Sequence, residues 1–181
     1  MLPRVPGMGV LPVAVDDDAA PGHGDPEPEA FEAFYRANVD RVFRALAVTL
    51  RHDELAREAV DEAMARAYAK WPTVRHLDNP AGWVFRVGLN WATSWWRKVR
   101  RERPPAADTA SPLAPPSDSA LAARDALAQL PTPQRAVVTC RILLDLTTAE
   151  TAVALGLSEG TVKSRLSRGL AVLRTALGEK E

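Results

Sequence analysis

Residues 147–177, TTAETAVALGLSEGTVKSRLSRGLAVLRTAL, decide the fold of the C-terminal part of the chain. A short helix is predicted over 148–155, and Gly156 can end it in the left-handed conformation that glycine adopts without strain. Ser158 is a favourable N-cap for a second helix, whose apolar stripe consists of Val162, Leu166, Leu170, Leu173 and Leu177. A short helix, a turn with glycine and a capped amphipathic helix form the pattern of a helix-turn-helix motif.

The opposite face of the last helix carries side chains that suit DNA. Threonine, serine and arginine recur there at three- and four-residue steps, and no acidic residue occurs between 160 and 178. Such side chains bond phosphate oxygens and base edges. The pattern favours DNA reading over the alternative of a solvated amphipathic face. The candidate DNA-contacting residues are Ser158, Thr161, Lys163, Ser164, Arg165 and Arg168, with Lys163 expected to contact phosphate only.

Two further helices are predicted before this motif. One lies around Leu121–Leu130, and Thr132-Pro133 opens the next, in which Val137, Val138 and Ile142 can face inward. Cys140 is the only cysteine, which excludes an intramolecular disulfide and a Cys-rich zinc site. We expect it to be a small buried residue, with a redox-sensing role as the alternative.

Residues 31–101 also show a helical pattern. Apolar residues recur at three- and four-residue steps from Phe31 to Leu50, and a second helix is expected to begin at an Asp53 N-cap and stop near Trp71-Pro72. Asn79-Pro80 is a favourable start for a third helix. Its four-residue stripe, Trp83, Val87, Trp91 and Trp95, is expected to be core and to leave Trp96 exposed. No useful strand-like alternation occurs, so the predicted fold class is all-α.

The formal net charge of zero over 181 residues conceals four unequal segments. Residues 1–30 carry six acidic residues against one arginine and are predicted to be a disordered acidic arm. Residues 31–101, the first module, have a net charge of +5, and residues 121–181, the second module, have +2. Between them, residues 102–120 hold five prolines among small and polar residues, which is typical of a flexible linker. Two small basic helical domains are therefore predicted.

The first module contains two charged clusters that could bind a partner. Glu58, Asp61, Glu62 and Arg66 share one side of the second helix, which favours a protein-docking surface over a plain solvated face. The third helix ends in Arg97, Lys98, Arg100 and Arg101 beside Trp96, and basic residues next to aromatic rings are typical of single-stranded nucleic acid binding.

Several classes of function are not supported by the sequence. The three histidines are scattered, and there is no Gly-rich phosphate loop or nucleophile motif, so we expect no enzyme activity, metal or cofactor. No run of about 18 apolar residues is present, and the N-terminal stretch is a poor secretion signal. The expected location is the cytoplasm, without membrane insertion.

These residues resemble the extracytoplasmic-function (ECF) group of bacterial RNA polymerase sigma factors. The matching stretches are AREAVDEAMARAYAKW (56–71), NPAGWVFRVGLNWATSWWRKVRR (79–101) and the whole of 130–177. Trp95-Trp96 and Glu150-Thr151 are similar to an actinobacterial subgroup. The resemblance implies a first module like sigma domain two and a second, helix-turn-helix module like sigma domain four.

The resemblance also implies the partners and the roles of the candidate residues. Core RNA polymerase would bind the helix that carries Glu58, Asp61, Glu62 and Arg66. Promoter DNA would be bound at two elements, one by each module. The melted −10 element would meet the 72–82 loop and third helix through Asn79, Asn90, Trp96, Arg97, Lys98, Arg100 and Arg101. The last helix would read the −35 element, and an anti-sigma factor is a further candidate partner.

Two other functions stay open on the sequence alone. A stand-alone helix-turn-helix regulator would bind DNA stably without polymerase, and a helical interaction protein would sequester a partner. Neither accounts for the acidic-face helix together with the Trp-rich segment.

Overall fold

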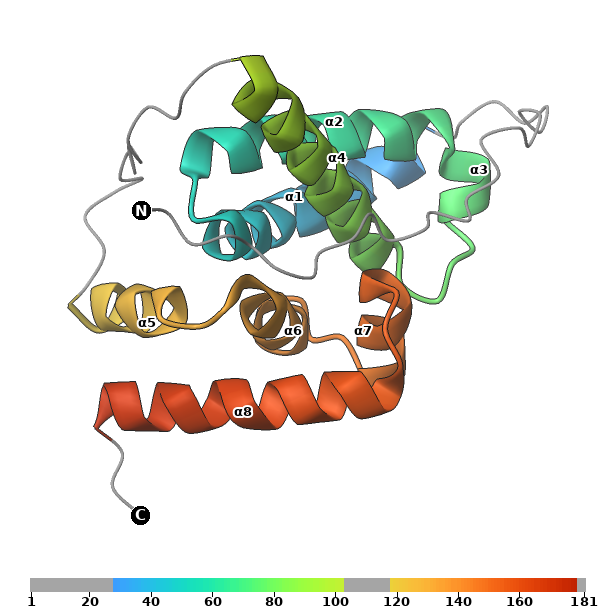
Figure 1. Ribbon diagram of the computed structural model, residues 1–181. Coiled ribbons are helices and arrows are strands. Elements are labelled where there is room, and N and C mark those ends of the chain that lie inside the picture. The colour runs from blue at the N-terminus through green and yellow to red at the C-terminus, as the bar shows by residue number, and fades with distance from the viewer. Residues whose placement is uncertain (1–27, 103–117, 179–181) are drawn as a thin grey trace.

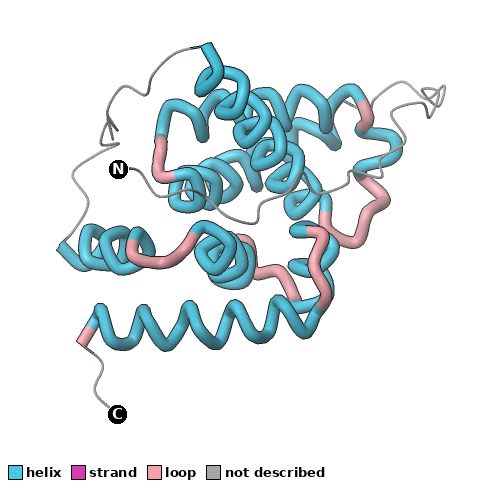
Figure 2. Tube along the Cα trace, viewed as in Figure 1, coloured by secondary structure: helices cyan, strands magenta, loops and turns pink. Residues whose placement is uncertain are grey.

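The computed structural model describes residues 28–102 and 118–178, with side chains described for 28–95 and 122–178. The first module consists of α1 (Pro28–Leu50), α2 (Asp53–Ala69), the short α3 (Trp71–Val74) and α4 (Pro80–Glu102). The second consists of α5 (Asp118–Ala128), α6 (Thr132–Ile142), α7 (Thr148–Leu155) and α8 (Glu159–Leu177). Within each module short loops join the helices, and the described residues include no strand (Figure 2). The all-α prediction is confirmed.

Two segment boundaries differ slightly from those predicted. The predicted acidic arm ended at residue 30, but α1 already begins at Pro28. The predicted linker spanned 102–120, whereas α4 extends through Glu102 and α5 begins at Asp118. The rest of the arm and of the linker lies outside the described residues.

The first module is built around close contact of α4 with α1 and α2 (Figure 1). Phe85 and Leu89 of α4 and Leu46 of α1 are almost completely buried there. Gly88 lets the helices approach. A Cβ at this position would lie 2.9 Å from Leu46 Cδ1 and 3.0 Å from the Ala59 backbone oxygen.

The junction of α1 and α2 corrects one predicted cap. Arg51 adopts a left-handed φ of 57° after the last turn of α1. His52, rather than Asp53, is the N-cap of α2, because its Nδ1 accepts a hydrogen bond from the Leu55 backbone N–H at 3.1 Å. Asp53 is the first helical residue, and its carboxylate accepts instead from Arg124 of α5.

The helix-turn-helix of the second module forms as predicted. Thr147 and Glu150 make a reciprocal capping box at the start of α7, and Gly156 ends the helix with φ 62°. Ser158 caps α8 by accepting from the Thr161 backbone N–H at 3.2 Å. The predicted caps at Gly156 and Ser158 are confirmed, because local residues determine them. The capping box of Thr147 and Glu150 was not predicted.

Three apolar residues expected inside are on the surface. Trp95 is 36% exposed and stacks on Trp91, because the C-terminal half of α4 extends beyond α1 and α2 (Figure 1). Ile142, the last residue of α6, is 58% exposed. Leu177, at the end of the α8 stripe, is 49% exposed, whereas Val162 at its start is buried.

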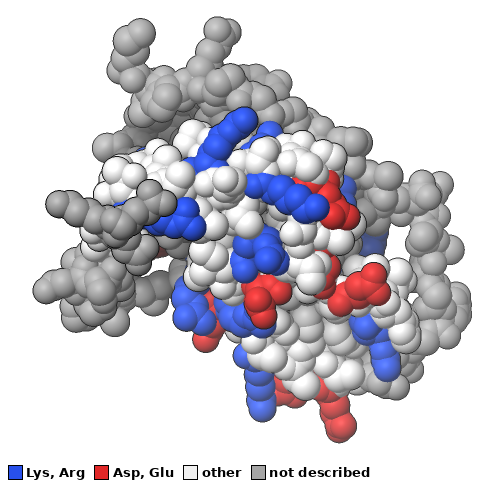
Figure 3. Space-filling view, turned by 90° about the horizontal axis from the view of Figure 1, so that it is seen from below, with Lys and Arg blue, Asp and Glu red and all other residues white. Residues whose placement is uncertain are grey.

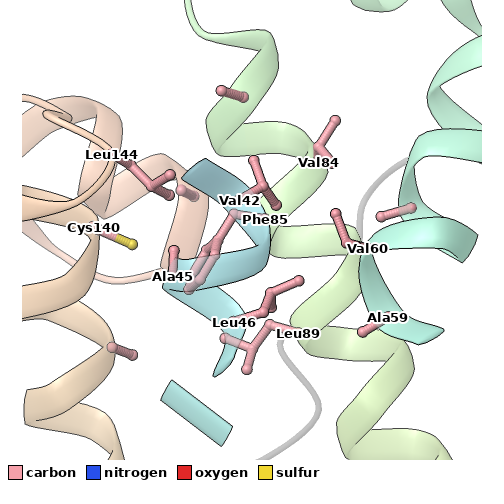
Figure 4. Packing of buried hydrophobic residues seen from close by; sticks show 14 of the residues in the cluster. Val42, Ala45, Leu46, Ala59, Val60, Val84, Phe85, Leu89, Cys140 and Leu144 are labelled. Atoms are coloured by element: carbon pink, nitrogen blue, oxygen red, sulfur yellow. The ribbon is translucent and has the colours of Figure 1, made fainter. Parts of the chain in front are cut away.

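The two modules pack on each other around one continuous hydrophobic core. Helix α6 lies between α8 and α1, and α7 lies beside the start of α4 (Figure 1). Cys140 and Leu144 of the second module point toward Val42 and Ala45 of α1 (Figure 4). Cys140 is fully buried, as expected, and burial raises the pKa of its thiol.

Gly88→Ala should lower the free energy of unfolding by about 1–3 kcal/mol, the usual cost of overpacking a tight core. The backbone oxygen of Ala59 cannot move aside as a flexible side chain would. Urea unfolding followed by circular dichroism measures the effect.

Gly160→Ala is the matched control, because only Ser158 Oγ comes within 4 Å of its added Cβ, at 3.9 Å. It should leave stability unchanged or raise it by up to about 1 kcal/mol, since alanine favours helix. Equal effects of the two substitutions would show that α4 does not pack this closely.

Candidate nucleic-acid interface

The predicted DNA face of α8 is directed away from the helices that support it. Buried Val162 and half-buried Leu166 face the core, while Lys163, Ser164 and Arg168 are exposed and Thr161 and Arg165 are half-buried. Within the described part of the chain, neither Arg165 nor Arg168 forms an ion pair. Both guanidinium groups are therefore available to an outside acceptor.

The first turn of α8 is held by its own polar side chains. The hydroxyls of Ser158 and Thr161 lie 2.9 Å apart, and Ser164 Oγ donates to the Thr161 backbone oxygen at 3.1 Å. Lys163 Nζ lies 4.0 Å from Glu159 Oε2. On the side of the molecule that α8 forms, basic side chains are interspersed with acidic ones (Figure 3). Contact with DNA would therefore depend on individual side chains rather than on one continuous basic patch.

Asn79 lies where the two modules meet. Its Oδ1 accepts from the Gly82 backbone N–H at 2.9 Å, which caps α4 as predicted. Its Nδ2 donates at 3.0 Å to Oε1 of Glu150, a residue of α7. The predicted 72–82 loop is shorter in the structure, since α3 includes residues 72–74 and α4 begins at Pro80.

The other predicted −10 residues lie farther along α4. Asn90 is half-buried, and its Nδ2 is covered and without a hydrogen-bond partner among the described residues. A DNA contact through this atom requires its surroundings to change. Trp96, Arg97, Lys98, Arg100 and Arg101 belong to the last turns of α4, but their side chains lie outside the described ones.

The charged side of α2 forms a separate surface. Glu58, Asp61 and Arg66 are exposed and Glu62 is half-buried, so the structure brings these four residues together as predicted. Arg66 Nε contacts Glu62 Oε1 at 2.7 Å. An exposed pair of this kind adds little stability, so the charges are free to serve a partner. Helix α2 lies on the other side of α1 and α6 from α8 (Figure 1).

The polar contacts that join the modules were not predicted from the sequence. Arg41 donates to the Leu144 backbone oxygen at 2.8 Å, Arg86 to that of Val153 at 3.3 Å, and Arg124 to the Asp53 carboxylate at 3.1 Å. Arg135 is only 5% exposed and donates to the Thr49 backbone oxygen. One signal for these contacts was available in the sequence: Arg135 lies on the inward face of a predicted helix.

The described residues form neither a metal site nor a membrane-spanning helix. Among residues 28–102 and 118–178, no group of three or more histidine, cysteine, aspartate or glutamate side chains could hold a metal ion. In the same described residues, no helix is long and apolar enough to cross a membrane.

Comparison with known proteins links both modules to one group. A family model described as sigma-70, region 4, matches residues 120–173. The RNA polymerase sigma-E factor of Streptomyces coelicolor is 34% identical over 153 residues, which cover 81% of this chain and 85% of that protein. The ECF RNA polymerase sigma factor SigM of Mycobacterium tuberculosis is 30% identical over 152 residues, with 82% and 78% covered.

A solved structure also shares the fold. It is the sigma factor RpoE of Bartonella quintana in complex with the anti-sigma factor NepR, with a TM-score of 0.73 and 21% identity. The similarity covers 84% of this chain and 99% of that chain.

Acid should weaken the contact between Asn79 and Glu150. Hydrogen bonds from Thr147, and then from Asn79, hold the pKa of Glu150 below its ordinary value of 4.5. A lowered carboxyl pKa stabilises the folded chain above the ordinary value, and this stabilisation is lost as the pH falls through the folded-state pKa. Glu150→Gln should therefore reduce stability near pH 7 and make the loss of stability below pH 4.5 less steep.

Urea unfolding of both chains from about pH 7 to about pH 3 measures this difference. The remaining carboxyl groups titrate in both chains, so the difference between the two pH profiles reports Glu150 alone. Parallel pH profiles for the two chains would show that Glu150 makes no such contribution.

Proposed function

Because the chain belongs to the ECF family of RNA polymerase sigma factors, we propose that it binds core RNA polymerase and directs promoter recognition and transcription initiation. It acts as a specificity subunit, making and breaking no covalent bond itself, in the cytoplasm. Its candidate partners are core polymerase, promoter DNA and an anti-sigma factor.

The observation that carries the proposal is the exposed polar face of α8 on a capped helix-turn-helix. In this motif the second helix enters the major groove with its N-terminal residues toward the bases. Thr161, Ser164 and Arg165 lie in the first two turns of α8, and Arg168 follows one turn later on the same side. We assign −35 reading to this face, with Ser158 at the cap and Lys163 toward phosphate.

The first module captures the melted −10 strand in this proposal. Unstacking a base costs a few kcal/mol, and least where the DNA is already single-stranded, so binding an extruded base favours the open complex. Asn79 and Asn90 supply polar groups. Trp96 and the basic residues Arg97, Lys98, Arg100 and Arg101 supply stacking and phosphate contacts.

The charged side of α2 binds core polymerase in this proposal. Glu58, Asp61, Glu62 and Arg66 are separated from the α8 face by α1 and α6, so one chain can contact polymerase and DNA together. Each module is only modestly basic, so stable promoter binding requires polymerase to hold both in register.

Purified chain added to sigma-free bacterial core polymerase should give promoter-dependent transcripts from genomic fragments and should co-elute with the core enzyme. Neither activity is expected from a chain in which Glu58 and Asp61 are both changed to lysine. Absence of both transcripts and co-elution with the unaltered chain would contradict the proposal. Stable binding of the chain to palindromic DNA without polymerase would instead support a stand-alone regulator.

Arg165→Ala and Arg168→Ala should each weaken use of the −35 element by about 1–3 kcal/mol if the guanidinium groups contact bases. Lys163→Ala is the matched comparison, since loss of a phosphate contact weakens binding about equally on all sequences and reduces its salt dependence. Transcription from promoters with substituted −35 bases measures both. Unchanged promoter preference in the arginine variants would show that this face of α8 is a solvated surface and does not contact bases.

A further inference from the structure

Aromatic rings gather at one end of the first module, where the start of α1 meets the end of α2 and α3 (Figure 1). The ring centroid of Phe31 lies 5.0 Å from that of Tyr68 and 5.3 Å from that of Trp71. The Phe34 ring also lies 5.0 Å from Trp71. These separations are typical of favourable aromatic pairs. We call this group the aromatic cluster, and its members are Phe31, Phe34, Tyr35, Tyr68 and Trp71.

The described residues leave the aromatic cluster partly uncovered. Tyr35 is 38% exposed and Tyr68 is 43% exposed, and both rings lie beside that of Phe31. Single exposed apolar side chains are ordinary on a protein surface, but exposed rings that contact one another mark an interaction site. The proposed polymerase and DNA contacts use none of these rings.

Trp71 adds a polar feature at the same place. It is only 5% exposed, and its indole Nε1 is covered, with no hydrogen-bond partner among the described residues. A buried N–H group without an acceptor is costly, and a buried tryptophan usually donates to one. We therefore expect the acceptor to come from outside residues 28–102 and 118–178.

Residues 1–27 join the described fold at the aromatic cluster. Helix α1 begins at Pro28, and Phe31 lies in its first turn. The preceding sequence contains the apolar stretch VLPVAV (10–15), which we call the apolar segment. The twelve residues 16–27 connect this segment to α1, and a chain of that length spans up to about 40 Å. The apolar segment can therefore turn back and reach the exposed rings.

The charges beside the apolar segment and beside the aromatic cluster are opposite. Three aspartates, residues 16–18, follow the apolar segment directly. Lys70 precedes Trp71, and the backbone N–H of Arg75 donates to the Trp71 backbone oxygen at 3.0 Å, so two basic residues lie next to the cluster. Exposed charges of this kind attract one another weakly, so they orient the segment while apolar contact holds it.

We propose that the apolar segment docks on the aromatic cluster of the same chain. Its valine and leucine side chains cover the exposed faces of Tyr35 and Tyr68, and one of its backbone carbonyls accepts from Trp71 Nε1. The aspartates that follow it lie toward the two basic residues. The inference does not rest on the proposed function, because every contact in it lies within one free chain.

Paramagnetic broadening in the NMR spectrum of the full chain tests this contact. A nitroxide attached to Asp17→Cys, with Cys140→Ala, lies two residues from the apolar segment. The indole N–H signal of Trp71 is assigned by its loss in Trp71→Phe. We expect this signal to lose most of its intensity, relative to the same sample after the nitroxide is reduced with ascorbate.

Leu11→Ser combined with Val13→Ser should remove the broadening, because the change takes away apolar area that covers the rings. It should also speed exchange of the Trp71 indole proton with solvent by about tenfold or more. Leu2→Ser combined with Val5→Ser is the matched control, since it changes the same residue types outside the apolar segment. The control should keep both the broadening and the slow exchange. Neither pair changes a residue of the described helices.

A mixture of two chains identifies the source of the contact. One chain is isotope-labelled and carries no nitroxide, and the other carries the nitroxide without isotope label. We expect no broadening in this mixture. Broadening there would assign the aromatic cluster to the segment of a second copy and would overturn the inference. Absence of broadening within the spin-labelled chain, or equal broadening and exchange in the two double variants, would overturn it as well.

Discussion

The buried guanidinium of Arg135 is the interaction on which the joint packing of the two modules depends. It donates to the Leu130 backbone oxygen and to Thr132 Oγ1 in its own module, and to the Thr49 backbone oxygen in the other. Burial, followed by repulsion from Arg51, lowers the pKa of Arg135 to about 10, so it stays charged near neutral pH. A buried charge is tolerated only when its hydrogen bonds are satisfied, so the end of α5, the start of α6 and the end of α1 must converge on this side chain.

The sequence was sufficient for most helix caps, which depend on neighbours along the chain. Asn79, Gly156 and Ser158 were identified as caps because capping involves residues within one helical turn. At the start of α2, His52 and Asp53 are adjacent polar residues, and only the packed structure shows that Asp53 pairs with Arg124 instead. The link from Asn79 to Glu150 joins residues far apart in sequence, and no periodicity reports such a pair.

The candidate site was predicted to different extents in its two halves. The polar face of α8 follows from helical spacing, and the structure brings Ser164 and Arg168 to the surface as that spacing requires. In the first module, spacing placed Trp95 in the core, but the end of α4 extends past its neighbours and leaves this ring exposed. The sequence patterns described each module separately, whereas the packing of one module on the other depends on residues far apart in the chain.

The packing of the two modules around one hydrophobic core is the feature on which the rest of the structure depends. Spin labels at exposed Glu54 in α2 and Thr175 in α8, with Cys140 replaced by alanine, allow the distance between the modules to be measured by electron–electron double resonance. The free chain should give one short, narrow distance distribution. A broad distribution would show that the two modules do not share one core.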